Sequence, residues 1–248
     1  MNSSASRSVS SSQTGLHPQL AKTVQRHFAS PWLKPAQRVD KAALAALDRA
    51  LAAHPGPLVL DSFCGTGMST ALLAERYPEA LVIGVDKSAD RLGRHAHTSG
   101  NYLLLQAHCE ALWRHLAESG RQLQAHYILY PNPWPKPTHL GRRVHGHPAF
   151  PLLLSLGGII ELRSNWQIYV EEFGVALHLA GVLSAIASLP TTGLALTLFE
   201  QKYCHSGQTL WQLRGNLAAD KAQRRNALAV KPARQSATLS GSEEEQTA

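Results

Sequence analysis

The chain alternates between short apolar runs and longer segments in which apolar residues recur every three or four positions. A short apolar run bounded by Gly, Pro or polar residues predicts a buried strand, whereas a period of three to four residues predicts a helix. On this basis we expect strands at 57–63, 80–86, 102–106, 126–130, 157–164, 194–200 and 209–214. We expect helices at 40–54, 68–77, 88–97, 110–119, 149–156 and 166–180.

This order of elements predicts the fold class. Asp40 can cap the helix 40–54, and Pro55-Gly56 stops it. The helix 166–180 would turn Tyr169, Phe173 and Leu177 inward. Strands that alternate with helices favour a doubly wound, mostly parallel α/β sheet, here of seven strands with helices on both faces. In such sheets the ligand lies at the carboxyl ends of the strands, at the topological switch point.

The chain of 248 residues suits one domain with tails. Residues 1–14 contain seven serines, and no acid precedes Asp40, so we interpret residues 1–39 as a flexible basic arm in preference to a transit peptide. Residues 40–217 would form the folded domain. Residues 218–248 are polar and end in an acidic run, which predicts a disordered tail.

Charge and cysteine usage narrow the choice of partners. With 24 Lys and Arg against 17 Asp and Glu, the formal charge of +7 favours a polyanionic partner, nucleic acid first, over a generally basic protein with none. The three cysteines have no zinc-like spacing, so we expect no metal and a reducing, cytoplasmic compartment. No run of 18 apolar residues occurs, so we expect no membrane span, and we expect a monomer.

The first two predicted strands end in residues typical of an adenosine-cofactor site. Gly65 and Gly67 follow the first strand, and Asp86, which could hold the ribose hydroxyls, lies 19 residues beyond Gly67. A dinucleotide and S-adenosylmethionine are both compatible with this pattern. Thr70 stands where a dinucleotide motif has its third glycine, and Asp61 would repel a pyrophosphate but could accept from an amino group. Both points favour S-adenosylmethionine.

A stiff loop follows the fourth predicted strand. Its sequence, Pro131-Asn132-Pro133-Trp134-Pro135, cannot continue a strand or lie inside a helix. Trp134 could stack on a base, and a packed loop anchor is the equally simple alternative. Cations follow at Lys136, Arg142 and Arg143, and they suit RNA phosphates. The loop therefore predicts the acceptor side of the site.

The segments "DSFCGTG", "VIGVDKS", "YPNPWPK" with a following "RR", "GGIIELRSNWQIY" and "TLFEQK" resemble the tRNA (guanine-N7) methyltransferase family, over roughly residues 55–214. This family has the class I, S-adenosylmethionine-dependent fold. The chain departs from its pattern at several positions. Asn132 replaces the loop Asp, Ser164-Asn165 replaces Thr-Asp, and Phe63 replaces a glycine. His108 stands where the family has an acid, and Lys202 stands near its usual Arg.

The resemblance implies S-adenosylmethionine as cofactor, RNA and in particular tRNA as partner, and methyl transfer to guanine N7. Asn132 and Glu200 would be the catalytic residues. The implied cofactor contacts are Asp61, Phe63, Gly65, Gly67, Asp86, Lys87, His108 and Asn132. The implied substrate contacts are Trp134, Lys136, Arg142, Arg143, Asn165, Thr197 and Glu200.

Two other functions remain open from the residues alone. "NPW" is similar to the Asn-Pro-Pro-aromatic loop of enzymes that methylate exocyclic amino groups, which would make the product an N2-guanine or N6-adenine. The two changes from Asp to Asn are also compatible with a non-catalytic RNA-binding relative. An amide at Asn132 can position a base edge, but it cannot offset positive charge on a purine.

Overall fold

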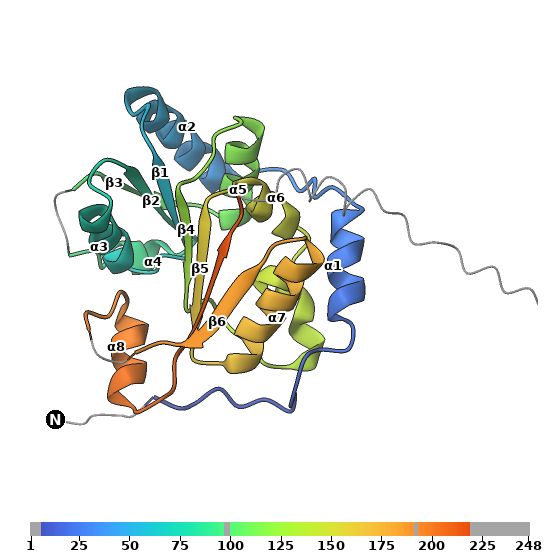
Figure 1. Cartoon of the computed structure of the whole chain (residues 1–248). Coiled ribbons are helices and arrows are strands. Elements are labelled where there is room, and N and C mark those ends of the chain that lie inside the picture. The colour runs from blue at the N-terminus through green and yellow to red at the C-terminus, as the bar shows by residue number, and fades with distance from the viewer. Residues whose placement is uncertain (1–5, 97–99, 191–192, 219–248) are drawn as a thin grey trace, which may run out of the picture.

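Seven strands form one central sheet in the computed structural model of the protein, which describes residues 6–96, 100–190 and 193–218 (Figure 1). The order across the sheet is β3-β2-β1-β4-β5-β7-β6, and the first five strands run parallel. The strands are β1 (Leu58–Ser62), β2 (Leu81–Asp86), β3 (Tyr102–Gln106), β4 (Ala125–Leu129), β5 (Ile159–Ser164), β6 (Ser184–Ser188) and β7 (Trp211–Asn216). The predicted fold class is confirmed.

The chain reverses its direction of travel across the sheet between β1 and β4. From β1 it moves outward to β2 and β3, and it then returns to place β4 on the other side of β1. The carboxyl ends of β1 and β4 therefore flank the topological switch point, where open α/β sheets bind their ligands. β7 is antiparallel to both β5 and β6.

Helices cover both faces of the sheet. One face carries α2 (Arg38–Ala53), α5 (Cys109–Glu118), α6 (Phe150–Ser155) and α7 (Gln167–Leu179), and α1 (Leu20–Phe28) packs outside α7. The other face carries α3 (Met68–Arg76). The remaining helices are α4 (Ala89–Leu92), α8 (Leu198–His205) and the short 3-10 turns η1 (Pro137–Arg142) and η2 (Val144–Gly146).

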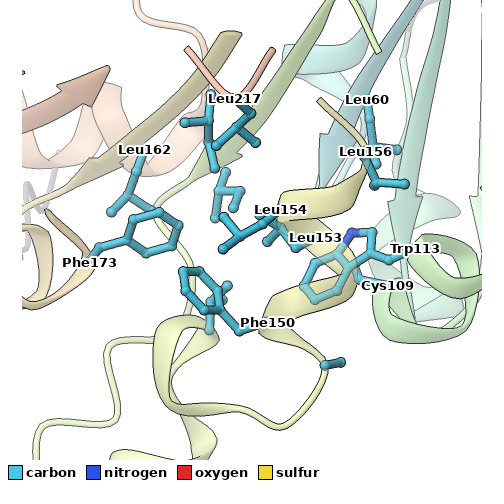
Figure 2. Close-up of a cluster of buried hydrophobic side chains, with 14 of the residues drawn as sticks. Leu60, Cys109, Trp113, Phe150, Leu153, Leu154, Leu156, Leu162, Phe173 and Leu217 are labelled. Atoms are coloured by element: carbon cyan, nitrogen blue, oxygen red, sulfur yellow. The ribbon is translucent and has the colours of Figure 1, made fainter. Parts of the chain in front are cut away.

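The larger core fills the space between the sheet and the four-helix face (Figure 2). Phe150 of α6 and Phe173 of α7 meet edge to face at 5.5 Å between ring centroids, and both are buried. Tyr169, Phe173 and Leu177 are fully buried, as the spacing along 166–180 predicts. This core fixes α7 against β5 and thereby anchors one wall of the site described below.

The sequence pattern was misleading around residues 194–200. We expected a strand there, but β6 lies earlier, at Ser184–Ser188, and Thr197 begins the helix α8. The Thr197 side chain accepts from the amide of Glu200 at 3.0 Å, which is one half of the capping-box pattern Thr-x-x-Glu. Leu198 and Phe199 are both about half exposed on this helix. Because these apolar residues lie on the exposed side of α8, they do not follow the spacing of a buried helix face. The segment was therefore predicted as a strand.

Two N-terminal expectations also need correction. Part of the supposed arm 1–39 is folded, since α1 buries Leu20 and Val24 against the core. Asp40 is the third residue of α2 and not its cap: Gln37 is the cap, and Asp40 accepts from its amide at 2.7 Å.

The remaining predicted elements agree with expectation apart from their lengths, whereas the turns η1 and η2 were not predicted. The helix expected at 88–97 is limited to Ala89–Leu92, where Ser88 caps it. The tail predicted at 218–248 lies outside the described residues except for Ala218. Within the described parts of the chain, no helix has both the length and the apolar character needed to cross a membrane.

Candidate functional site

The turn between β1 and α3 adopts an unusual backbone that brings main chain to the surface of the switch point. Phe63, Gly65 and Gly67 have φ of 63°, 61° and 76°, in the left-handed region. Side chains rarely adopt this region, so Phe63 is strained where the resembled family has a glycine. A Cβ at Gly67 would lie 2.7 Å from Leu104, whereas one at Gly65 would meet nothing within 4 Å. Open space therefore lies beside the turn at Gly65.

Asp61 lies fully buried at the end of β1. One of its oxygens, Oδ2, accepts from the hydroxyls of Ser69 at 2.6 Å and Thr70 at 2.7 Å. Its other oxygen, Oδ1, is buried without a hydrogen-bond partner. Burial raises the pKa of Asp61 to about 6, and the two hydroxyls oppose this rise only in part. A donor group from a ligand would satisfy the unpaired oxygen.

Asp86 ends β2 beside the same turn. Its carboxylate accepts from the amide of Gly65 at 3.1 Å and from the amide of Ser88 at 2.8 Å, and Arg91 lies 3.5 Å away. Asp86 thus holds the glycine turn in place, while each oxygen keeps a further lone pair for a ligand hydroxyl. Lys87, the next residue, is exposed.

His108 follows β3 and completes this side of the site. Asp40 of α2 accepts from its amide at 2.8 Å and lies 3.0 Å from its ring Nδ1. The His108 ring is one-third exposed, and the buried carboxylate of Asp40 fixes its orientation. The ends of β1, β2 and β3 together offer a glycine turn, an acid and a flat ring, which fit an adenosine-type cofactor.

The Pro-rich loop after β4 forms the other side of the switch point. Tyr130 and Trp134 have φ of 53° and 46°, so two bulky residues lie in the left-handed region within five positions. Such strain persists only where the surroundings hold it, and it is frequent at functional sites. Asn132 is exposed, and its Oδ1 accepts from the amide of Trp134 at 3.4 Å.

Trp134 is half-buried, and Arg142 and His139 lie beside its ring. The Arg142 guanidinium lies 4.8 Å from the Trp134 ring centroid, and His139 meets the ring edge-on at 5.4 Å. A base that stacks on Trp134 must use the opposite face or displace Arg142. Lys136 and Arg142 are both exposed, as a phosphate contact requires.

Arg143 corrects a sequence expectation, because it cannot hold RNA phosphates. Its side chain is fully buried and pairs with Glu172 of α7 at 2.5 Å. It also donates to the carbonyl oxygens of Trp134 at 3.2 Å and Lys136 at 3.4 Å. Two adjacent arginines therefore differ completely: Arg142 faces solvent, whereas Arg143 braces the loop from inside.

A buried ion cluster stands between β5 and α8. Nη1 of Arg163 donates to both carboxylate oxygens of Glu200, at 2.9 and 3.1 Å, and Arg163 pairs with Glu161 at 2.7 Å. Tyr130 has a buried hydroxyl without a hydrogen-bond partner. Burial first, and then the charge of Glu200, raise the pKa of Tyr130 well above its ordinary value. Glu200 is therefore a paired carboxylate beside an unpaired hydroxyl.

The remaining predicted substrate contacts have structural partners. Asn165 donates to the side chain of Gln208 at 2.9 Å, and it does not cap α7, whose first turn begins after Trp166. Thr197 caps α8 as described. Ser69 and Tyr130 were not among the predicted site residues, and Thr70 was noted only as a departure from a dinucleotide motif. The available signal for Ser69 and Thr70 was a pair of hydroxyls in the first turn of the helix after a buried acid.

Comparisons with known proteins agree with this geometry. A family model described as "Putative methyltransferase" matches residues 55–213. The tRNA (guanine-N(7)-)-methyltransferase of Thiobacillus denitrificans is 32% identical over 176 residues, which cover 66% of this chain and 77% of that protein. The enzyme of the same name from Sodalis glossinidius is 27% identical over 211 residues, or 77% of this chain and 85% of that protein.

A solved structure shows the same fold at low identity. A variant of the 16S rRNA (adenine(1408)-N(1))-methyltransferase from Catenulisporales acidiphilia, solved with its cosubstrate SAM, matches with a TM-score of 0.51 at 17% identity. The match covers 72% of this chain and 92% of that one.

The sheet order, the glycine turn after β1 and the acid after β2 define a methyltransferase with a Rossmann-like, class I fold. Within this class, the chain belongs to the tRNA (guanine-N(7)-)-methyltransferase family.

Proposed function

We propose that this protein transfers the methyl group of S-adenosylmethionine to N7 of a guanine in tRNA. The observation that carries the proposal is the pairing of two half-sites at one switch point. The half-site at β1–β3 fits an adenosine cofactor, and the half-site after β4 offers a loop with the half-buried Trp134 and the exposed cations Lys136 and Arg142. The names of the relatives favour guanine N7 over other acceptors.

The cofactor half-site would hold S-adenosylmethionine through three contacts. Asp86 accepts from the ribose hydroxyls, the ring of His108 lies against the adenine, and the free oxygen of Asp61 accepts from an amino group. The open space at Gly65 leaves room for the ligand beside the backbone. Bound in this way, S-adenosylmethionine supplies an electrophilic methyl carbon on its sulfonium.

The reaction depends on the alignment of guanine N7 with the methyl carbon more than on acid–base chemistry. The lone pair of guanine N7 forms the new bond to the methyl carbon while the carbon–sulfur bond breaks and its electron pair stays on sulfur. No proton leaves N7, so no general base is needed. Positive charge develops on the purine, and a nearby carboxylate offsets it. Glu200 is the carboxylate available, and Arg163 neutralises part of its charge.

The RNA half-site would use Trp134 as a stacking surface and Lys136 and Arg142 as phosphate contacts. Asn132 would hold the edge of the target base through its amide. Three free thiols, two of them buried, suit a reducing cytoplasm.

One experiment tests the whole proposal. Purified protein is incubated with methyl-labelled S-adenosylmethionine and total tRNA, and the RNA is digested to nucleosides and separated. We expect label in 7-methylguanosine. Label in an N-methylated exocyclic amine would assign the alternative acceptor, and no label despite cofactor binding would leave an RNA-binding relative.

Asn132→Asp tests the acceptor loop. Asp can accept from the Trp134 amide as Asn132 does, and it adds a charge that offsets the one developing on the purine. We expect kcat for 7-methylguanosine formation to rise by about tenfold, which corresponds to about 1.4 kcal/mol of the barrier. Asn216→Asp is the matched control, because Asn216 is exposed at the end of β7 and its Oδ1 likewise accepts from a backbone amide, that of Ala218 at 2.9 Å. Loss of activity in Asn132→Asp would mean that the amide reads a different base edge.

A further inference from the structure

The N-terminal segment 6–17, which we call the strap, crosses the acceptor side of the site. Figure 1 shows it in dark blue, running beneath α8 and the foot of α7 before it turns up into α1. At its start, the amide of Ser6 donates to the Ser206 hydroxyl at 2.8 Å, and Gln208 donates to the Ser6 carbonyl at 2.8 Å. Gln208 in turn holds Asn165. The strap thus touches the turn after α8 next to a predicted substrate residue.

Further along, the strap meets the Pro-rich loop directly. The hydroxyl of Ser11 donates to the carbonyl of Pro135 at 2.6 Å, and it also accepts from the amide of Gln13 at 3.0 Å. Pro135 lies between Trp134 and Lys136, two of the residues proposed to contact RNA. One strap hydroxyl is therefore bonded to the centre of that loop.

Glu172 of α7 anchors the strap inside the protein. One carboxylate oxygen of Glu172 accepts from the Gln13 side chain at 2.7 Å and from the His17 amide at 2.9 Å. The other oxygen accepts from Arg143 at 2.5 Å and from His145 at 2.9 Å. Burial alone would raise the pKa of Glu172, but its bonds to His145 and Arg143 outweigh burial and lower the pKa to about 2. The carboxylate is ionised and fully engaged.

Arg143 connects Glu172 and the strap to the Pro-rich loop. The Arg143 guanidinium donates to the side-chain oxygen of Gln13 at 2.9 Å and to Glu172. It also donates to the carbonyls of Trp134 and Lys136. Gln13 therefore bonds both members of a buried ion pair, donating to one and accepting from the other. Without Gln13, one donor of Arg143 and one acceptor site of Glu172 lose their partner in a buried place, which is costly.

The loop needs this support because its backbone is strained. Trp134 keeps φ at 46°, and bonds from Arg143 and Asn132 hold its carbonyl and its amide. A strained residue relaxes when such bonds loosen. A shift of the Trp134 ring by about 1 Å is enough to cost up to 100-fold in a reaction that depends on alignment.

We propose that the strap is a positioning element of the methyl-transfer site, in which Gln13, through Glu172 and Arg143, and Ser11, through Pro135, hold the Trp134–Lys136 loop in its RNA-binding geometry. The inference rests on the proposed function for its consequence in catalysis. Its structural part concerns the loop alone and is measured separately.

The test compares the wild type with Gln13→Ala, Ser11→Ala and the double variant, each in the full-length chain. Ser12→Ala and Thr14→Ala are matched controls, since both side chains are exposed on the same segment. Amide hydrogen exchange is read by mass spectrometry in peptides that cover 131–143 and 61–67. Methyl transfer to tRNA and calorimetric binding of S-adenosylmethionine are measured with the same preparations.

We expect faster exchange in 131–143 and unchanged exchange in 61–67 for the double variant, but no change for the controls. We expect kcat/KM for tRNA to fall by about 10-fold to 100-fold, with the dissociation constant of S-adenosylmethionine within about twofold of wild type. Unchanged exchange in 131–143 overturns the inference whether or not the wild type is active. Faster exchange with full methyl transfer overturns the positioning role. A wild type that makes no 7-methylguanosine contradicts the proposed function and leaves the exchange result to decide on the strap.

Discussion

At the scale of single residues, Asp61 combines a nearly neutral titration point with an unpaired oxygen. Its pKa of about 6, raised by burial, means that it is half-protonated under mildly acidic conditions. If it accepts from an amino group of S-adenosylmethionine, its ionised form accepts more strongly than its protonated form, so binding and deprotonation are linked.

This linkage predicts a pH dependence with a definite sign. One pH unit below a pKa, about one carboxyl in ten is ionised, so we expect affinity for S-adenosylmethionine to be roughly tenfold weaker at pH 5 than at pH 7. Asp61→Asn should bind more weakly at pH 7 and show a flat profile over the same range. Calorimetry at four pH values measures both. The same pH profile in both proteins would show that the amino group lies elsewhere.

Tyr130 presents the opposite case, a buried hydroxyl beside the paired carboxylate of Glu200. A buried, unpaired polar group costs about 1–3 kcal/mol, so Tyr130→Phe should raise the free energy of unfolding by about 1 kcal/mol. The same change removes a polar group beside Glu200, and we expect kcat/KM for tRNA to fall by about tenfold.

Tyr77→Phe is the contrasting control for this prediction. Its hydroxyl is bonded to that of Tyr127 at 2.8 Å, so its removal should cost about 1 kcal/mol and leave methyl transfer unchanged. Urea unfolding and steady-state kinetics distinguish the two variants. A Tyr130→Phe protein with full activity would assign the unpaired hydroxyl to packing alone.

At the scale of elements, Arg142 at the end of η1 and the adjacent Arg143 are expected to have different roles. Arg142→Ala should leave stability within about 0.5 kcal/mol, weaken tRNA binding and lower the slope of log affinity against log salt by about 1. Arg143→Ala leaves Glu172 buried beside an empty partner site and should cost about 3–5 kcal/mol. Denaturant titrations and binding at several salt concentrations measure these effects. Equal stability losses in the two variants would contradict the burial of Arg143.

The elements that could be predicted from sequence are those whose apolar residues are buried. β1, β2 and β4 are buried on both faces, so each contains a continuous run of apolar residues. The prediction of α8 failed because Leu198 and Phe199 face outward. The strand β6 was missed because its sequence, "SAIAS", is short and mostly exposed. Which face of an element is buried depends on the tertiary structure. A local pattern of apolar residues therefore predicts an element only when those residues lie on its buried face.

The positions of the proposed cofactor residues were easier to predict than those of the proposed acceptor residues for a related reason. Asp61, Gly65, Gly67 and Asp86 lie at or just after the ends of strands, and strand ends can be located from local sequence. Arg143 and Arg142 are indistinguishable in sequence, because what separates them is Glu172, 29 residues later. Pairing of this kind depends on packing between distant elements.

At the scale of the whole molecule, two buried groups on neighbouring strands oppose each other as pH falls. Burial lowers the pKa of His126 from 6.5 to about 3, so the unfolded chain takes up this proton first and stability is lost as pH falls from 6.5 toward 3. Burial raises the pKa of Asp61 from 3.8 to about 6, so the folded state takes up that proton first and stability is gained from pH 6 to 3.8.

These opposite contributions are separable by substitution. Relative to wild type, His126→Gln should gain about 1.4 kcal/mol per pH unit on acidification from pH 6 to 4, and Asp61→Asn should lose a similar amount. Gln can keep the contact that the His126 ring makes with Ser62 at 2.8 Å. Urea midpoints at pH 6, 5 and 4 give the slopes. Parallel stability curves for all three proteins would show that neither group stays buried at these pH values.

The strap also sets an order of events in time. Ser6 leaves the ribosome long before Gln208, yet the two are bonded across 202 positions of the chain. Contacts of such long sequence separation close large loops and form late in folding. The glycine turn and Asp86 belong to β1 and β2, which pair locally and need none of these late contacts. The strap, although it is made first, can therefore be fixed at its start only when the domain is nearly complete.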